Sequence, residues 1–458
     1  MAARLSLAVI LTLAYGWAFI VAASGLRAAA GPNAADAAAT RFEISFPAGA
    51  HAGAITGRAF VVITKTDKPE PRLVAGSWGD SGPLYGVDVN ALEPDHAAVI
   101  DGETFGSPVH SLREIPAGDY FVQAIVNIYT EFHRADGHTV WLHMDQWEGQ
   151  HFNRSPGNLY SEAQKVHLDP AAGYDIKLSL TKVIPPVEVP PDTAWVKHVK
   201  IQSEMLTKFW GHPIYIGAIV VLPRGYDEHP NAHYPVVYVH NHFSLRPAFG
   251  FTTEDEPVPA AMRARLADAN RETGYEFYQS WNSDNFPRMI AVTFQHPTPY
   301  YDDSYAVNSV NNGPYGDALV KEMIPYLEAH FRMIPKPYAR VLTGGSTGGW
   351  ESLGAQVFYP DFFGGTWTLY PDSVDFWRYG TVNAYEDDNA FYEPGHTWVK
   401  VPRSIQRTAE GQDEISVQQF SEMEAVEGSH GRSASQIEIW DAAYGPVGDD
   451  GYPVPLWD

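Results

Sequence analysis

The stretch Tyr338-Ala-Arg-Val-Leu-Thr-Gly-Gly-Ser346-Thr-Gly-Gly-Trp350 decides the fold of this chain. A short apolar run leads into a glycine-flanked serine, and a helix-forming run follows from Trp350. The order of strand, G-x-S-x-G and helix is typical of a nucleophile elbow. A serine on such a sharp turn needs neighbours that tolerate close backbone approach, which glycine does at least cost. The alternative is a glycine-rich turn that only lets a helix pack on a sheet.

The bulk composition indicates a large globular protein of two or three domains. The chain has 458 residues, of which 45% are hydrophobic and 13% aromatic. Its formal net charge of −24 argues against nucleic acid or an anionic membrane as partner, because both need basic patches. The chain has no cysteine, which excludes thiolate catalysis, cysteine-based metal sites and disulfides.

The first 30 residues resemble a signal peptide. Arg4 supplies the positive start, residues 5–21 are almost wholly apolar, and small residues follow at 22–24 and 28–30. The alanine-rich leader at 31–40 favours cleavage, and an uncleaved N-terminal anchor is the alternative. We expect an exported protein, and its lack of disulfides favours the periplasm or secretion by a bacterium.

Two domains with a linker between them are expected downstream. Residues 41–183 alternate with period 2 in several runs separated by turn residues, which predicts an immunoglobulin-like β-sandwich. Residues 184–193 are proline-rich and predict a stiff linker. In residues 194–458 buried strands alternate with helices, which predicts a mostly parallel sheet covered on both faces.

Several motifs in this second domain resemble the esterase D and enterochelin esterase-like branch of the α/β-hydrolases. The resemblance spans roughly residues 199–375. It rests on Val220-Val-Leu-Pro-Arg-Gly-Tyr226, Tyr234-Pro-Val-Val-Tyr238, Ile324-Pro-Tyr-Leu-Glu-Ala-His-Phe-Arg332, Gly345-Ser-Thr-Gly-Gly349 and Tyr359-Pro-Asp-Phe-Phe-Gly364. It implies an α/β-hydrolase fold and a serine esterase, acting by ester hydrolysis or acyl transfer through a Ser-His-Asp triad without a cofactor.

The same resemblance assigns the candidate site residues. Ser346 matches the nucleophile, and the amide of Thr347 matches the first oxyanion donor. The second donor comes from the loop after the strand that ends at Tyr238, where the family usually has His-Gly. Here Asn241 and His242 take those places, and the amide of Phe243 is the expected donor. Asp372 is the best acid candidate and Asp375 the second.

The general base is the incomplete part of this assignment. Only His396 and His430 follow the serine, and both resemble loop histidines. The segment Gln436-Ile-Glu-Ile-Trp440 is the best candidate for a further strand. We therefore expect a chain that is truncated or divergent and lacks the last strand and the usual triad histidine.

Two other functions compete with the esterase. The pair His240-x-His242, with Asp302 and Asp303, predicts a metal-dependent hydrolase as the less favoured alternative. A catalytically defective hydrolase fold acting as an extracellular binding protein is the other. The expected ligand is a small-molecule or carbohydrate ester, because aromatic residues are frequent near the expected cleft (Trp281, Tyr300, Tyr301, Tyr305, Tyr315, Trp350 and Trp367).

Overall fold

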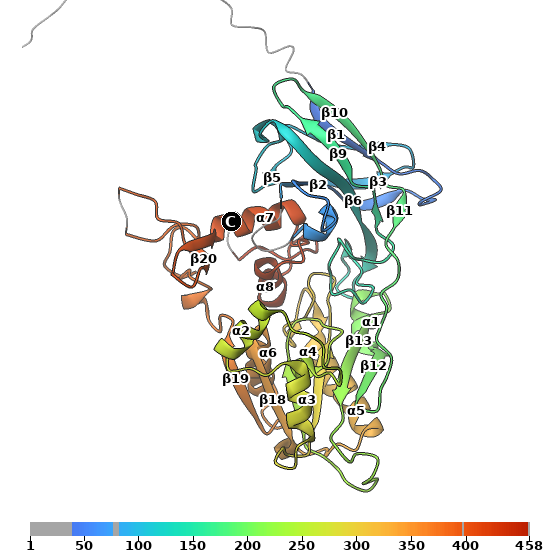
Figure 1. Ribbon diagram of the computed structural model, residues 1–458, viewed down its shortest axis with the longest axis vertical. Helices are drawn as coiled ribbons and strands as arrows, with labels where there is room; N and C mark the ends of the chain where they lie inside the picture. The colour runs from blue at the N-terminus through green and yellow to red at the C-terminus, as the bar shows by residue number, and fades with distance from the viewer. Residues whose placement is uncertain (1–38, 77–81, 396–397, 457–458) are drawn as a thin grey trace, which may run out of the picture. The chain divides into compact units, whose positions relative to one another are not determined.

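The computed structural model describes residues 39–76, 82–395 and 398–456 (Figure 1). The predicted signal peptide and nearly all of the predicted leader therefore lie outside the described residues. Residues 38–458 form one compact unit by their contacts. None of the described helices is both long and apolar enough to cross a lipid bilayer.

The first, N-terminal part of the described chain, from β1 to β11 (residues 40–183), consists of two sheets that share a core. One sheet has the order β10 (Tyr174–Ser179), β1 (Thr40–Ser45), β4 (Ala97–Asp101). The other has the order β11 (Lys182–Val183), β8 (Leu159–Tyr160), β6 (Gly118–His133), β2 (Ile55–Thr64), β3 (Leu84–Leu92), β5 (Gly106–Ser107), with β7 (Thr139–His143) and β9 (Gln164–Leu168) also on β6.

Alternate residues of these strands face the space between the sheets. Phe42 and Ile44 of β1 lie in one buried cluster with Val61 of β2 and Val122 of β6. This packing agrees with the predicted period-2 pattern, since every second side chain of a strand points to the same face. It supports two packed sheets, but it does not establish the immunoglobulin type, and β1 and β10 pair in parallel.

The second part is built on a six-stranded sheet. Its order is β12 (Val196–Gln202), β13 (Tyr215–Val221), β15 (Ile290–Gln295), β14 (Val236–His240), β18 (Arg340–Ser346), β19 (Gly365–Pro371). The first two strands join the sheet antiparallel, and the last four are mutually parallel. This confirms the predicted mostly parallel sheet.

Helices cover both faces of this sheet. On one face, Val221 and Ala291 pack with Trp281 of α3 (Gly274–Asn282). On the other face, Tyr238 packs with residues of α4 (Tyr315–Ala318), α5 (Ile324–His330) and α6 (Thr347–Phe358). Strands buried on both faces need apolar side chains at every position, which is why the sequence shows continuous apolar runs here.

The remaining helices complete the architecture. They are α1 (Glu204–Trp210), α2 (Ala260–Asp268), α7 (Val417–Glu427) and α8 (Gln436–Tyr444); short pairs are formed by β16 (Asn308–Ser309) with β17 (Gly313–Pro314) and by β20 (Ser404–Arg407) with β21 (Asp413–Ser416). The helical stretch over residues 315–330 consists of α4, a π-helical turn (Leu319–Met323) and α5.

The prediction of a strand at residues 436–440 is wrong, because these residues begin α8. Their alternation of polar and apolar residues fits a strand. However, α8 is buried on most of its sides, with Ile437, Ile439 and Trp440 all in the core. A helix that is buried nearly all round does not display a 3.6-residue hydrophobic stripe.

The predicted linker at 184–193 contains no helix or strand, but the two cores do not separate there. Phe132 of β6 and Leu142 of β7 belong to the core of the second part. Conversely, Val426 of α7 packs with Phe60 and Val62 of β2. The long strand β6 therefore contributes to both cores.

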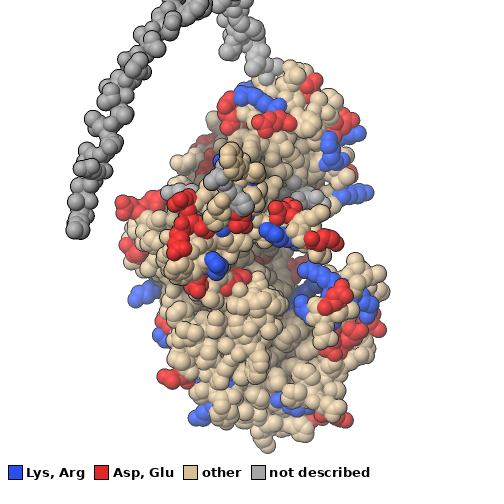
Figure 2. Space-filling model, turned by 90° about the vertical axis from the view of Figure 1, so that its left-hand side faces the viewer, with Lys and Arg blue, Asp and Glu red and all other residues tan. Residues whose placement is uncertain are grey.

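On the face drawn in Figure 2, acidic and basic side chains are interspersed.

Candidate active site

Ser346 lies at a strained strand-to-helix turn. It is the last residue of β18 and precedes the first residue of α6, with φ 56° and ψ −124°. A Cβ on Gly344 would lie 2.1 Å from the carbonyl oxygen of Gly348, and one on Gly348 would lie 2.1 Å from that of His240. Only glycine fits at both positions. The Ser346 residue itself is exposed, which is the arrangement of a nucleophile elbow.

Asp372 meets this serine directly. It follows β19, the parallel neighbour of β18, and its Oδ1 accepts a hydrogen bond from the Ser346 Oγ at 3.0 Å. The other oxygen, Oδ2, accepts from the hydroxyls of Tyr305 and Thr347 at 2.7 Å each and from Gln436 Nε2 at 3.2 Å. The carboxylate is thus fixed by four donors.

Asp375, the second acid candidate, lies elsewhere in the turn. Its Oδ1 accepts from the amide of Trp377 at 2.9 Å, so it caps a short 3₁₀-helix. This is the ordinary turn chemistry of aspartate.

The two expected oxyanion donors lie on segments next to the elbow. Thr347 is the first residue of α6, so its N–H is among those that lack an intrahelical acceptor. Phe243 lies in the loop formed by residues 241–245, which we call the oxyanion loop after its expected role. This loop leaves β14 beside the elbow, because β14 and β18 pair in parallel with His240 opposite Gly344. Anions are stabilised near a helix N-terminus such as that of α6.

His242, in the same loop, is held between two carboxylates. Its Nδ1 lies 3.1 Å from Oδ1 of Asp302 and 3.1 Å from Oδ2 of Asp303. Burial alone would lower the pKa of His242, but the charges and hydrogen bonds of the two aspartates raise this pKa to about 12. Burial raises the pKa of Asp302 to about 7. His242 is therefore an imidazolium at neutral pH.

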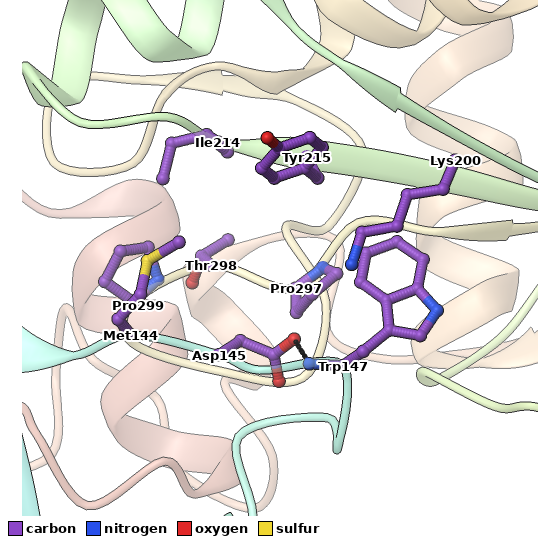
Figure 3. A pocket seen from close by; sticks show the side chains of 9 residues that line it. All are labelled: Met144, Asp145, Trp147, Lys200, Ile214, Tyr215, Pro297, Thr298 and Pro299. Carbon is purple, nitrogen blue, oxygen red and sulfur yellow. Dashed lines mark hydrogen bonds between the residues drawn. The ribbon is translucent and has the colours of Figure 1, made fainter. Parts of the chain in front are cut away.

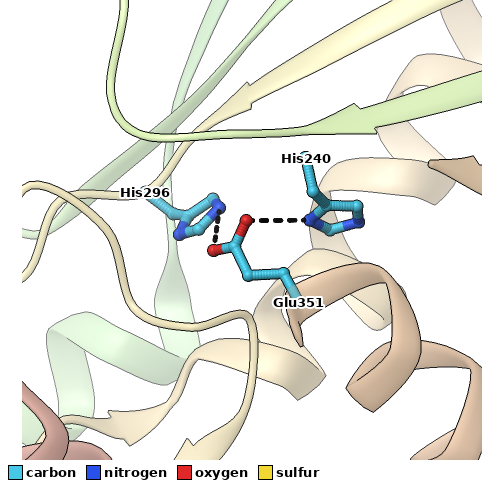
Figure 4. Close-up of side chains that lie close together, drawn as sticks. All are labelled: His240, His296 and Glu351. Atoms are coloured by element: carbon cyan, nitrogen blue, oxygen red, sulfur yellow. Dashed lines mark ion pairs between the residues drawn. The ribbon is translucent and has the colours of Figure 1, made fainter. Parts of the chain in front are cut away.

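His240, two residues earlier, enters a different and fully buried cluster (Figure 4). Its Nδ1 lies 3.4 Å from Glu351 Oε2, and His296 Nε2 lies 3.5 Å from Glu351 Oε1. Burial lowers the pKa of His240 to about 3 and that of His296 to about 4. Burial also raises the pKa of Glu351 well above its usual value. Both histidines are therefore uncharged at neutral pH, and burial favours the protonated, neutral form of Glu351.

Each of these two clusters has the composition of a metal site. In the buried cluster, however, His296 Nδ1 accepts the amide N–H of Ser304 at 3.1 Å. That ring nitrogen therefore has no hydrogen, and in the neutral ring Nε2 carries it. Nε2 then faces Glu351 as a donor and has no lone pair for a cation. His240 and His242 also point into separate clusters, so the H-x-H pair does not form one site.

Of the two histidines that follow Ser346 in sequence, the structure describes only His430, and no hydrogen bond joins it to the serine. His430 is exposed and pairs with Asp450 at 3.3 Å. His396 lies outside the described residues. Within the described part of the chain, no histidine forms a hydrogen bond to Ser346.

Sequence reasoning missed Gln436 and Trp440 as members of the site. Gln436 donates to Asp372, to Thr347 Oγ1 and to the Tyr305 hydroxyl, and Trp440 Nε1 donates to that hydroxyl at 2.6 Å. Both residues come from α8, about 90 residues after the serine in sequence, and no local motif marks them. Trp281, in contrast, belongs to the core under α3 and donates to the carbonyl of Leu222.

A polar cavity of about 160 Å³ adjoins this hydrogen-bond network. Tyr301 and Gln436 line it and hydrogen-bond each other at 2.8 Å, which links the cavity to Asp372. The rest of its wall comes from several stretches of the chain (Ala75, Gly76, Gln150, His151, Phe152, Asn153, Asp302, Glu427, Ser433, Ala434 and Ser435). Burial raises the pKa of Glu427 to about 8.

Comparison with known proteins connects this site to esterases. Residues 215–422 match the model of the family described as "Putative esterase". The resemblance to esterases that the sequence motifs indicate is thereby confirmed. Ser346, Asp372 and Phe243 lie within the matched range. No curated protein matches the chain.

Three solved structures illustrate the likeness. A ferulic acid esterase of Anaeromyces mucronatus, solved with ferulic acid, is 20% identical over 39% of this chain and 59% of its own, with a TM-score of 0.24. An S-formylglutathione hydrolase of Agrobacterium tumefaciens is 14% identical over 40% and 60%, with a TM-score of 0.26. An IroE-like serine hydrolase of Shewanella oneidensis is 19% identical over 39% and 51%, with a TM-score of 0.24. The chain thus matches little more than half the length of these structures.

Proposed function

We propose that this protein is an exported serine esterase with Ser346 as its nucleophile. The observation that carries the proposal is the exposed Ser346 hydroxyl at a strained elbow, 3.0 Å from a carboxylate oxygen of Asp372. Backbone strain of this kind clusters at active sites, where it is part of the mechanism. The family match over residues 215–422 supports the same reaction class.

The reaction follows from these contacts. The Ser346 Oγ attacks the ester carbonyl carbon, and its proton passes to Asp372 Oδ1 as the new C–O bond forms. The carbonyl oxygen becomes an oxyanion that the amides of Thr347 and Phe243 stabilise. When the intermediate collapses, the C–O bond to the alcohol breaks and the alcohol takes the proton. Water then hydrolyses the acyl-enzyme by the same steps.

The donors on Asp372 Oδ2 orient the carboxylate for this chemistry. The hydroxyl of Tyr305 and the amide of Gln436 hold it in the orientation that leaves Oδ1 for the serine. Carboxylates in general are weaker bases than imidazole. We therefore expect slow turnover when Asp372 alone accepts the proton.

The polar cavity beside Gln436 is the proposed place for the substrate. Its wall offers hydroxyl, amide and carboxyl groups, and its described lining residues include no lysine or arginine that would pair with an anion. An uncharged ester with hydroxyl groups, such as a carbohydrate or aryl ester, suits this lining.

A catalytically defective binding protein is the second candidate. It is favoured by one observation, namely that no histidine contacts Ser346 among the described residues. Under this alternative the cavity would bind a ligand and Ser346 would not react.

A fluorophosphonate probe distinguishes the two functions. We expect one probe per protein in the wild type and none in Ser346→Ala. Ser373→Ala is the matched control, because Ser373 follows Asp372 directly but does not contact the nucleophile. A folded wild-type protein without labelling would overturn the esterase and favour the binding protein.

A further inference from the structure

A short segment of the N-terminal part has an unusually fixed backbone. The carboxylate of Asp145 accepts the amide hydrogens of Trp147 at 2.7 Å, Gly149 at 2.8 Å and Gln150 at 2.8 Å. Trp147, Gly149 and Gln150 all have positive φ values, of 79°, 76° and 60°. Strained backbone of this kind persists where surrounding contacts hold it. We call residues 145–150 the Asp145 segment.

Trp147 in this segment packs against the oxyanion loop. Its ring meets the ring of Phe243 edge to face, with 5.5 Å between centroids and 87° between planes. Lys200 Nζ lies 3.9 Å from the centroid of the same indole (Figure 3). A Cβ on Gly217 of β13 would lie 2.6 Å from this indole. The tryptophan is therefore fixed on the central sheet and presents its ring to Phe243.

Gly149 makes a second contact with the same phenyl ring. A Cβ at Gly149 would lie 2.8 Å from Phe243 Cδ1, which is closer than van der Waals contact permits. The absence of a side chain at position 149 thus determines how near Phe243 approaches the Asp145 segment.

The neighbours of Phe243 in the oxyanion loop are fixed from the other side. The carbonyl of Ser244 accepts a hydrogen bond from Gln295 Nε2 at 2.8 Å. His242 is held by Asp302 and Asp303 as described above. Three consecutive residues of the loop therefore have separate anchors, and the anchor of Phe243 comes from the N-terminal part.

We propose that the Asp145 segment is a positioning element of the esterase site, which holds Phe243 so that its backbone amide faces the oxyanion. The inference rests on the proposed function. Trp147 and Gly149 act through Phe243 and do not touch the substrate. A donor of this kind contributes only when its hydrogen lies in the direction of the developing charge, so a small shift of the loop lowers the rate.

The test compares two glycine variants with matched backbone strain. Gly149→Ala adds a methyl group that collides with Phe243. Gly157→Ala, in the same part of the chain, also places alanine at a positive φ, of 88°, but has no atom within 4 Å of its Cβ. The strain is thus common to both variants, and the collision belongs to Gly149→Ala alone.

With a p-nitrophenyl ester well below the melting temperature, we expect kcat of Gly149→Ala to fall about 10²-fold with KM nearly unchanged. Affinity for a trifluoromethyl ketone, whose adduct carries an oxyanion, should fall by the same factor as kcat/KM. Gly157→Ala should retain both values. Equal kcat values for the two variants would overturn the proposal, whether both variants keep the wild-type value or both lose it to the same extent.

A second measurement does not depend on activity. Hydrogen exchange of residues 241–245 should be faster in Gly149→Ala and in Trp147→Leu than in Gly157→Ala, because the loop loses its anchor. Unchanged exchange in both variants would overturn the positioning role even if Ser346 proves unreactive. Failure of the esterase function itself appears separately, as absence of fluorophosphonate labelling in the wild type.

Discussion

His240 and His242 are two residues apart and have opposite electrostatic states. His242 is half-exposed, lies between two aspartates and keeps its proton, with a pKa near 12. His240 is buried beside Glu351 and His296 and stays neutral, with a pKa near 3. The difference arises because opposite charges stabilise a proton on one ring, whereas burial without a charged partner removes it from the other. A spacing motif such as H-x-H therefore does not establish that its two histidines share a function.

The largest expected effect is on the free energy of unfolding, and it tests whether Glu351 is neutral or charged in the fold. We expect Glu351→Ala to lower the free energy of unfolding by about 3 kcal/mol, because it opens a cavity beside two buried imidazoles. Glu351→Gln should cost less than about 1 kcal/mol, since the amide has the shape of the protonated carboxyl. Urea unfolding measures both. Equal losses in the two variants would mean that Glu351 is charged in the fold.

The pH dependence of stability tests the neutral state of His240. Its folded pKa of about 3 lies below the ordinary value of 6.5. Between these values the unfolded chain binds one more proton than the folded one, so stability falls as the pH is lowered through this window. We expect His240→Gln to reduce the slope by at most about 1.4 kcal/mol per pH unit. An unchanged slope between pH 6 and pH 4 would show that His240 is protonated in the fold.

The protonation of His242 can be tested by removing the charge of Asp303. Asp303→Asn should lower the pKa of His242, which histidine NMR measures directly, because one of the two neighbouring charges is lost. We also expect a fall of about tenfold in kcat/KM, since the oxyanion loop loses part of an anchor. Asp284→Asn, which removes an exposed partner of Arg224, is the control and should change neither quantity.

The smallest effect concerns metal binding in the buried cluster. Because His296 presents a hydrogen rather than a lone pair to Glu351, we expect EDTA to shift the melting temperature by less than about 1 °C. Zinc added to wild type and to His296→Gln should affect both alike. Stabilisation by zinc that His296→Gln abolishes would contradict the hydrogen-bond assignment of this ring.

Much of the second part could be predicted from local sequence. The elbow, the apolar strands and the acid at the tip of β19 each leave a pattern within a dozen residues, and the structure places Asp372 at Ser346. Gln436 and Trp440 could not be found this way, because their helix is buried nearly all round and lacks an amphipathic stripe. The predicted boundary at residues 184–193 also does not separate two independent cores, because β6 and α7 each pack into the core of the other part.

The sequence by itself determined the positions that tolerate one residue type. Glycines 344 and 348 are required because backbone atoms lie about 2 Å from where their Cβ atoms would be. Only the tertiary structure decided which side chains meet across long separations in sequence. Examples are the contact of the Asp145 segment with the oxyanion loop and that of Asp372 with Gln436 of α8. Those contacts depend on how segments far apart in the sequence pack together, and no spacing within one segment records that.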